Sequence, residues 1–256
     1  MGRRIVGFAS DRGLVATGAG RAGCVVDRAD ALRYVGHAGQ ELDAALEERF
    51  ERLACQCESC CDVSYIWRVE EVDASRRFGE LVPQVVLAGS GLVLEGADVA
   101  RHLSGAKLVA VFAATLGQDC ERELKRLAAT NALDHLLFDC CASSLAEVGA
   151  QAVQDIIADE ARKLGLCAHA RFSPGYGDLP LAVQPAFLSA LDATRKIGLT
   201  TTSGNFLLPS KSVTAIVGLF DESCADASAD PCEVCAARGY CCYRERGTTC
   251  RDWQLR

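Results

Sequence analysis

The chain has 256 residues, half of them hydrophobic and 24% charged, so it is long and apolar enough to form an ordinary folded core. Its formal net charge of −7 argues against a nucleic-acid-binding protein, which needs a basic surface to neutralise phosphates. No stretch has the apolar length that a membrane span requires, and the apolar part of the N-terminus is too short for a signal peptide. We therefore expect a cytoplasmic protein with no nucleic-acid or membrane partner.

The first half of the chain predicts a helix followed by strands. Residues 29–53 place apolar side chains at helical spacing, and Asp27 is the expected N-cap. Apolar and polar residues alternate over 63–70, which predicts a strand. Two short apolar segments flank Gly89-Ser-Gly91 and predict a hairpin over residues 85–94.

The second half predicts longer helices and two more strands. Residues 107–114 form an apolar run typical of a buried strand, and a helix is expected over 119–128. A long amphipathic helix around Leu145 to Leu164 ends at Gly165. Another helix is expected to start at Pro185, continue over 187–197 and stop before Gly198. A last strand follows, with Val213, Ala215, Val217 and Leu219 alternating.

Strands and helices occur in pairs rather than in a regular βαβ alternation. This order predicts an α+β fold in which helices surround a mainly antiparallel sheet. Beyond Asp221 the residues become small, acidic and rich in cysteine. We expect two domains, residues 1–221 and a Cys-rich segment over 222–256.

The glycines at positions 18, 20 and 23 match the G-x-G-x-x-G pattern of dinucleotide-binding loops. That pattern needs a strand before the loop and a helix that opens at it. Here the following residues, Cys24-Val-Val26, look like a strand. We therefore predict a glycine-rich hairpin rather than a dinucleotide site.

Residues 171–180, Arg-Phe-Ser-Pro-Gly-Tyr-Gly-Asp-Leu-Pro, combine a cation, an aromatic ring and two prolines in one expected loop. The prolines lack the N–H that a central strand needs, and they interrupt a helix. Gly175 permits a positive φ or a close approach to a ligand. Arg171 offers a planar fork for a carboxylate, and Tyr176 offers a ring face and a hydroxyl. From the residues alone, both a surface turn between helices and a ligand-binding loop stay open.

The spacing Arg171-x-x-x-Gly175-Tyr176-x-x-x-Pro180 resembles the S-adenosylmethionine-binding signature of the activation domain of cobalamin-dependent methionine synthase. Residues 31–46 are similar to the short, free-standing bacterial members of this family. Further stretches resemble the same family in the same order, and together the matches cover about 133–219: Leu145-Ala-Glu147, Ile197-Gly-Leu-Thr200 and Leu208-Pro-Ser-Lys-Ser-Val213.

The resemblance implies an α+β activation fold and a site for S-adenosylmethionine. Arg171 would pair the ligand's carboxylate, while Pro174 and Gly175 would let backbone groups reach the ligand. Tyr176, by resemblance, would lie near the corrin and help to arrange the cobalt environment, which makes it the candidate catalytic residue. Glu147 aligns with a glutamate near the ligand; an ordinary solvated charge on an amphipathic helix is the alternative.

Two departures from the family pattern concern this site. The family commonly has Thr-Glu-Ser where this chain has Thr202-Ser203-Gly204, so one carboxylate is missing. The strand after Ser212-Val213 carries aliphatic residues, Ile216 and Val217, where long family members have aromatic ones.

Fifteen cysteines are many for a cytoplasmic chain of this length, and without a signal peptide they favour metal, cluster or redox roles over disulfides. The spacing near the C-terminus predicts a four-thiolate site for zinc or an iron–sulfur cluster, with Cys250 nearby: Cys232, Cys235, Cys241 and Cys242. For a second cluster, a bound metal, redox thiols that face a partner and incidental cysteines stay equally open: Cys55, Cys57, Cys60 and Cys61. Three others in helical, apolar context are expected to be small core residues: Cys120, Cys140 and Cys141.

The resemblance implies a stand-alone reactivation protein. It would support reductive methylation of cob(II)alamin, as a component of a methyltransferase reaction, by holding S-adenosylmethionine over the corrin of a partner. This chain has no Asp-x-His-x-x-Gly cobalamin motif, so the cobalamin would be carried by a corrinoid protein or by a methionine synthase without its own activation domain. Flavodoxin or ferredoxin is the expected kind of electron donor. Two alternatives are an electron-transfer or metal-binding accessory protein with a degenerate S-adenosylmethionine site, and a zinc-bearing scaffold.

Overall fold

The computed structural model describes residues 4–5, 13–37, 39–73, 83–221 and Gly239. Contacts divide the chain into two units, Met1–Asp221 and Glu222–Arg256, and the fold described below is that of the first. The cysteines expected to bind zinc or an iron–sulfur cluster lie outside the described residues: Cys232, Cys235, Cys241 and Cys242.

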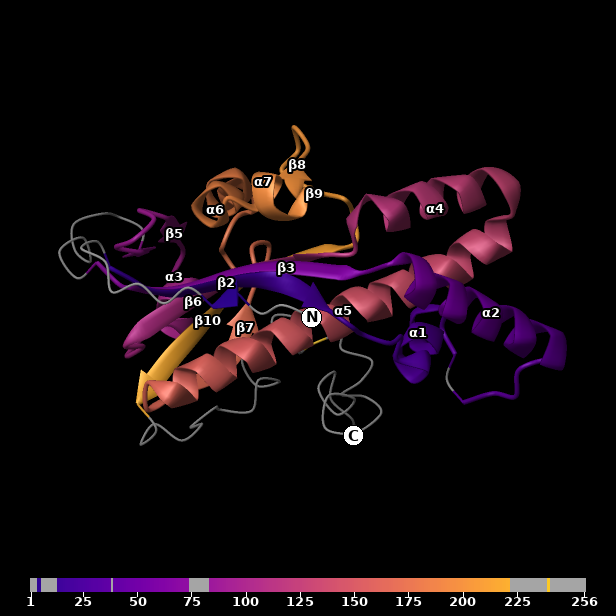
Figure 1. The fold of residues 1–256 in the computed structure, drawn as a ribbon, viewed down its shortest axis with the longest axis horizontal. Coiled ribbons are helices and arrows are strands. Elements are labelled where there is room, and N and C mark those ends of the chain that lie inside the picture. The colour runs from indigo at the N-terminus through magenta and orange to yellow at the C-terminus, as the bar shows by residue number, and fades with distance from the viewer. Residues whose placement is uncertain (1–3, 6–12, 38, 74–82, 222–238, 240–256) are drawn as a thin grey trace. The chain divides into compact units, whose positions relative to one another are not determined.

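A six-stranded sheet in the order β1-β2-β3-β6-β10-β7 forms the centre of the unit (Figure 1). Every neighbouring pair in this sheet is antiparallel, which confirms the predicted α+β class. The strands are β1 (Arg4–Ile5), β2 (Leu14–Ala22), β3 (Val63–Glu71), β6 (Leu108–Thr115), β7 (Leu166–Phe172) and β10 (Ser212–Asp221).

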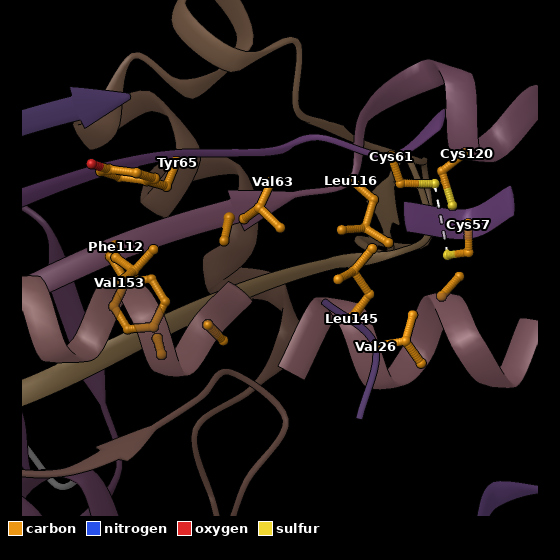
Figure 2. Close-up of a cluster of buried hydrophobic side chains, with 14 of the residues drawn as sticks. Val26, Cys57, Cys61, Val63, Tyr65, Phe112, Leu116, Cys120, Leu145 and Val153 are labelled. Carbon is orange, nitrogen blue, oxygen red and sulfur yellow. Dashed lines mark hydrogen bonds between the residues drawn. The ribbon is translucent and has the colours of Figure 1, made fainter. Parts of the chain in front are cut away.

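The long α5 packs along one face of the sheet, and three further helices pack against α5 (Figure 1). The four are α1 (Arg28–Tyr34), α2 (Ala44–Cys60), α4 (Gly117–Thr130) and α5 (Ala132–Lys163). Tyr65 and Phe112 from the sheet meet Leu145 and Val153 from α5 in one continuous apolar core (Figure 2). Each such side chain stabilises the fold by about 1.5–3 kcal/mol when it leaves water.

The opposite face is covered by smaller elements, which form a second core around Ile66, Val111 and Ile216. They are the hairpin β4 (Gln84–Val86) and β5 (Val93–Glu95), the helices α3 (Ala97–His102), α6 (Gln184–Leu191) and α7 (Ala193–Ile197), the single turn η2 (Leu181–Val183), and the pair β8 (Thr200–Thr201) and β9 (Leu207–Leu208). The central strands are therefore buried on both faces, as fits a sheet with helices on each side.

Two predicted helices are each split by a residue with positive φ. The expected helix over 29–53 becomes α1 and α2, with Gly36 and Gly39 at φ +83° and +95° between them. The expected helix over 187–197 breaks at Asp192, which has a φ of +55°. Asp27 is confirmed as an N-cap, because its carboxylate accepts a 3.0 Å hydrogen bond from the backbone N–H of Asp30.

The predicted glycine-rich hairpin near position 20 is wrong, because Gly18 and Gly20 lie inside β2. They face the rings of the neighbouring strand: a Cβ on Gly18 would lie 2.7 Å from Trp67, and one on Gly20 would lie 2.9 Å from the Tyr65 hydroxyl. The glycines thus make room for aromatic side chains in the core. No helix opens at this segment, since α1 begins only at Arg28, so the dinucleotide pattern has no structural counterpart here.

Contrary to the expectation from sequence, one described helix, α5, has the length and apolar composition that could cross a membrane. Its apolar residues pack on the sheet, and 56% of its most apolar 18-residue stretch is buried. Its composition is thereby accounted for as that of a core helix.

Candidate functional site

The Arg171 motif joins the end of β7 to η2. The sequence predicted a loop from the first residue of the motif, but Arg171 and Phe172 are the last residues of β7 and pair with Val217 and Ile216 of β10. The Arg171 side chain therefore projects from a strand of the sheet rather than from a loop. A strand fixes the direction of its side chain more firmly than a loop does.

The turn that follows is fixed by its own backbone. Gly175 has a φ of +93°, and its N–H donates to the Leu179 carbonyl at 2.8 Å. The Tyr176 N–H donates to the Ser173 carbonyl at 3.0 Å. Leu179 is buried in the second core, and the Asp178 carboxylate accepts hydrogen bonds from two backbone N–H groups at the start of α3. The turn is thus anchored at its far end.

A groove of about 390 Å³ lies beside this turn. Three of the residues predicted for the site line it, namely Glu147, Pro174 and Tyr176. The remaining walls come from α6, the β8–β9 hairpin and the start of β10, and include Gln184, Asn205, Phe206, Leu207, Ser210, Ser212 and Thr214. Gly175 shapes the turn and Arg171 contacts Glu147, but neither is among the described residues that line the groove.

Arg171 reaches across to α5 and forms an ion pair with Glu147, with 2.6 Å between Nη2 and Oε2. Its Nη1 also donates to the side-chain oxygens of Gln151 at 3.0 Å and Gln154 at 3.2 Å. The Arg171 side chain is 15% exposed and that of Glu147 is 32% exposed. These three contacts leave two of the five N–H donors of an arginine for another acceptor.

The floor of the groove carries a buried polar pair that sequence analysis missed. The Thr214 hydroxyl on β10 donates to Oε1 of Gln184 on α6 at 2.9 Å, and both residues are almost fully buried. Thr214 lies within an apolar strand pattern that gave no sign of a polar contact. No local pattern in the sequence indicated that Gln184 lies opposite it. A buried glutamine amide beside a groove is a directional donor for a ligand.

Two exposed aromatic side chains lie on the rim. Tyr176 is 59% exposed and Phe206 is 65% exposed. Phe206 belongs to the β8–β9 hairpin, whose tight turn is closed by a 2.8 Å hydrogen bond from the Thr202 N–H to the Phe206 carbonyl. Ser203, where the family has a carboxylate, is exposed on this turn and is not among the described residues that line the groove.

The second turn of α4 holds another wall of the groove through Glu121. The carboxylate of Glu121 accepts hydrogen bonds from the Ser210 N–H at 3.0 Å and its hydroxyl at 2.8 Å. Burial acts to raise the pKa of Glu121, but these hydrogen bonds and the charges of Lys125 and Lys211 outweigh it, so that its pKa lies below the usual value.

The described cysteines form no metal centre: within the residues that the structure describes, no group of three or more His, Cys, Asp or Glu side chains is arranged to hold a metal ion. Cys140 and Cys141 are buried core residues, as predicted. Cys120 is buried too, but it lies beside the thiols at the end of α2, a contact that its sequence position did not reveal.

No protein-family model and no curated protein sequence matches this chain. Among solved structures, the chain is similar to a crystal structure of the MetH reactivation domain bound to AdoHcy. The two share 15% sequence identity with a TM-score of 0.55, and the match covers 91% of this chain and 86% of the other. At this identity the likeness establishes a common fold.

Proposed function

We propose that this chain is an S-adenosylmethionine-binding reactivation protein that supports reductive methylation of cob(II)alamin on a partner. The partner is a corrinoid protein or a methionine synthase that lacks its own activation domain. The observation that carries the proposal is the groove beside the Arg171 turn, where Glu147, Pro174 and Tyr176 meet. The likeness in fold to a reactivation domain that binds AdoHcy supports it.

The size and chemistry of the groove suit an adenosyl amino acid. Its volume of about 390 Å³ lies in the range of small-molecule sites. The ligand's amino-acid part carries a carboxylate and an ammonium group. The partly exposed Glu147, which lines the groove, matches the ammonium group. Arg171 stands next to it as the candidate partner of the carboxylate, with two N–H donors left over from its contacts, although it is not itself among the described residues that line the groove. The buried amide of Gln184 and nearby hydroxyls such as Ser212 match the polar edges of ribose and adenine.

The ion pair between Arg171 and Glu147 also sets the charge near the bound ligand. Glu147 places a negative charge near the position of a sulfonium cation, while Arg171 keeps that carboxylate oriented towards the groove. When bound, the ligand supplies an electrophilic methyl group. The chain itself binds and orients the donor, and Tyr176 on the rim shapes the surface that faces the partner's cobalt. A flavodoxin or ferredoxin would supply the electron.

The alternative is an electron-transfer or metal-binding accessory protein with a degenerate S-adenosylmethionine site. It rests on the cysteine clusters and on the serine at position 203. Because Ser203 does not line the groove in the described part of the chain, the missing carboxylate weakens the binding proposal less than the sequence suggests.

Titration calorimetry with S-adenosylmethionine and with AdoHcy tests the proposal. We expect both to bind, and we expect Arg171→Ala to weaken binding by about 10-fold or more, because it removes a charge-assisted contact and frees Glu147. Arg195→Ala is a matched control, since Arg195 is an exposed residue on α7 that forms an ion pair with Asp192. A folded wild-type protein that binds neither compound at sub-millimolar concentration would rule the proposal out.

A further inference from the structure

Four thiols gather where α2 ends and α4 begins. Cys57, Cys60 and Cys61 lie at the end of α2, and Cys120 lies in the first turns of α4. The Sγ atom of Cys61 is 3.5 Å from that of Cys60 and 3.9 Å from that of Cys57. The Cys120 side chain lies beside that of Cys61 (Figure 2). Two thiols therefore lie within 3.9 Å of the Cys61 sulfur, and Cys120 lies beside it on another helix.

The four thiols differ in access to solvent. Cys57, Cys61 and Cys120 are 0%, 5% and 1% exposed. Cys60 is half-buried and lines a polar groove of about 600 Å³, which also contains Arg21, Gly117 and Arg122. A reagent in this groove meets the sulfur of Cys60 first, while the other three stay behind it.

The pKa values of Cys60 and Cys61 are shifted in opposite directions. A hydrogen bond from Cys61 holds the pKa of Cys60 below its usual value. The pKa of Cys61 is raised by its hydrogen bonds with Cys120, Cys57 and Cys60, and further by burial. Cys60 is thus more readily deprotonated than Cys61, and the thiolate is the nucleophilic form. Cys61 keeps its proton until it has an acceptor.

A metal centre fits this arrangement poorly. The neighbouring sulfurs contact the Cys61 sulfur itself, whereas metal ligands surround a shared vacant point. In the part of the chain that the structure describes, no three His, Cys, Asp or Glu side chains are placed to hold a metal ion. Thiol chemistry, rather than metal binding, is what the geometry supports.

We propose that Cys60, Cys61 and Cys120 form a dithiol–disulfide exchange site that reduces low-molecular-weight disulfides. The Cys60 thiolate attacks a disulfide R–S–S–R, forms Cys60–S–S–R and releases one R–S⁻. Cys61 attacks the Cys60 sulfur, releases the second R–S⁻ and forms a bond between adjacent residues. Cys120 then attacks the Cys61 sulfur, which leaves a Cys61–Cys120 disulfide and restores the Cys60 thiolate.

In the net reaction, two protein thiols are oxidised to one disulfide while one molecule of R–S–S–R is reduced. Cys61 and Cys120 each give up a proton and together lose two electrons, and the reagent becomes two molecules of R–SH. The intermediate between adjacent cysteines is strained, because its small ring departs from ordinary disulfide geometry. Transfer to Cys120, which belongs to a different helix, relieves that strain.

The site shares a helical turn with the first groove. Cys120 faces the thiols, and the next residue, Glu121, holds Ser210 in the wall of the groove beside the Arg171 turn. The exchange chemistry itself does not depend on S-adenosylmethionine binding, so the two proposals stand or fall separately.

Peptide mapping of the reduced full-length chain tests the exchange site. The protein is treated anaerobically with hydroxyethyl disulfide, remaining thiols are alkylated, and trypsin is added. We expect a disulfide that joins the peptides over 53–68 and 108–122, which fragmentation assigns to Cys61 and Cys120 and which dithiothreitol reverses. Cys60→Ser should slow its formation by about 10-fold or more, because the accessible thiolate is lost.

Two further variants make the result specific. Cys120→Ala, checked for folding by circular dichroism, should abolish the cross-link between the peptides and leave the mixed disulfide on Cys60 or a bond within 53–68. Cys55→Ser, at the exposed cysteine of the same helix, should change nothing. The proposal is overturned if wild type forms no such cross-link, if Cys60→Ser forms it equally fast, or if the purified protein carries a stoichiometric metal that Cys120→Ala loses.

Discussion

Arg171 at the end of β7 and Glu147 in the middle of α5 form an ion pair with 2.6 Å between their nearest atoms. The two residues are 24 positions apart in sequence, and a helix and a strand must pack together to bring them into contact. The pair ties the turn of the Arg171 motif to the core helix.

Removing one partner of this pair should destabilise the fold. Glu147→Gln replaces a charged acceptor beside a largely buried guanidinium, so we expect a loss of about 1–2 kcal/mol in the free energy of unfolding. Urea unfolding measures it. Asp159→Asn is the control on the same helix, where an exposed pair with Arg162 should be worth less than about 0.5 kcal/mol. Equal effects of the two substitutions would contradict a structural role for the pair.

The hydrogen bonds between Glu121 and Ser210 should make stability depend on pH. The pKa of Glu121 is lower in the folded state than in the unfolded chain, so its contribution is fully present above the unfolded value of about 4.3 and is lost as the pH falls through the folded value. Glu121→Gln should therefore cost about 1 kcal/mol at neutral pH and progressively less in acid. Unfolding measured across this range checks it, and a pH-independent cost would refute the assignment.

Gly18 should tolerate no larger side chain. A Cβ at this position would lie 2.7 Å from the ring of Trp67, which is 1% exposed and has no room to move. We expect Gly18→Val to destabilise the protein by about 2 kcal/mol or more and to change tryptophan fluorescence. Gly23→Ala is the control, because nothing lies within 4 Å of the added atom. Similar melting temperatures for the two variants would disprove the packing argument.

Phe206 should matter for binding more than for stability. Its side chain is 65% exposed on the groove rim, so Phe206→Ala should shift the free energy of unfolding by less than about 0.5 kcal/mol. If the groove holds an adenosyl ligand, the same change should weaken AdoHcy binding by about 3- to 10-fold through lost ring contact. Leu164→Ala, at an exposed leucine at the end of α5, should affect neither measurement. Unchanged affinity in Phe206→Ala would exclude the ring from the site.

Much of the fold was predictable because its signals are local. The alternation in β3, the glycines between β4 and β5, the apolar run of β6 and the stop at Gly165 each specify an element through neighbouring residues. The predictions failed where the backbone takes a positive φ without an obvious breaker, as at Asp192. They failed also at Gly18, where a glycine serves a ring on another strand rather than a turn.

The sequence by itself determined the α+β class, most of the elements and the residues that make up the Arg171 motif. The tertiary structure alone decided that Arg171 contacts Glu147, that Gln184 and Thr214 pair in the groove, and that Cys120 lies beside Cys61. The physical reason is the range of the interactions. Helix and strand patterns depend on spacings of two to four residues, whereas these contacts join side chains whose proximity is set only when helices close over both faces of the sheet.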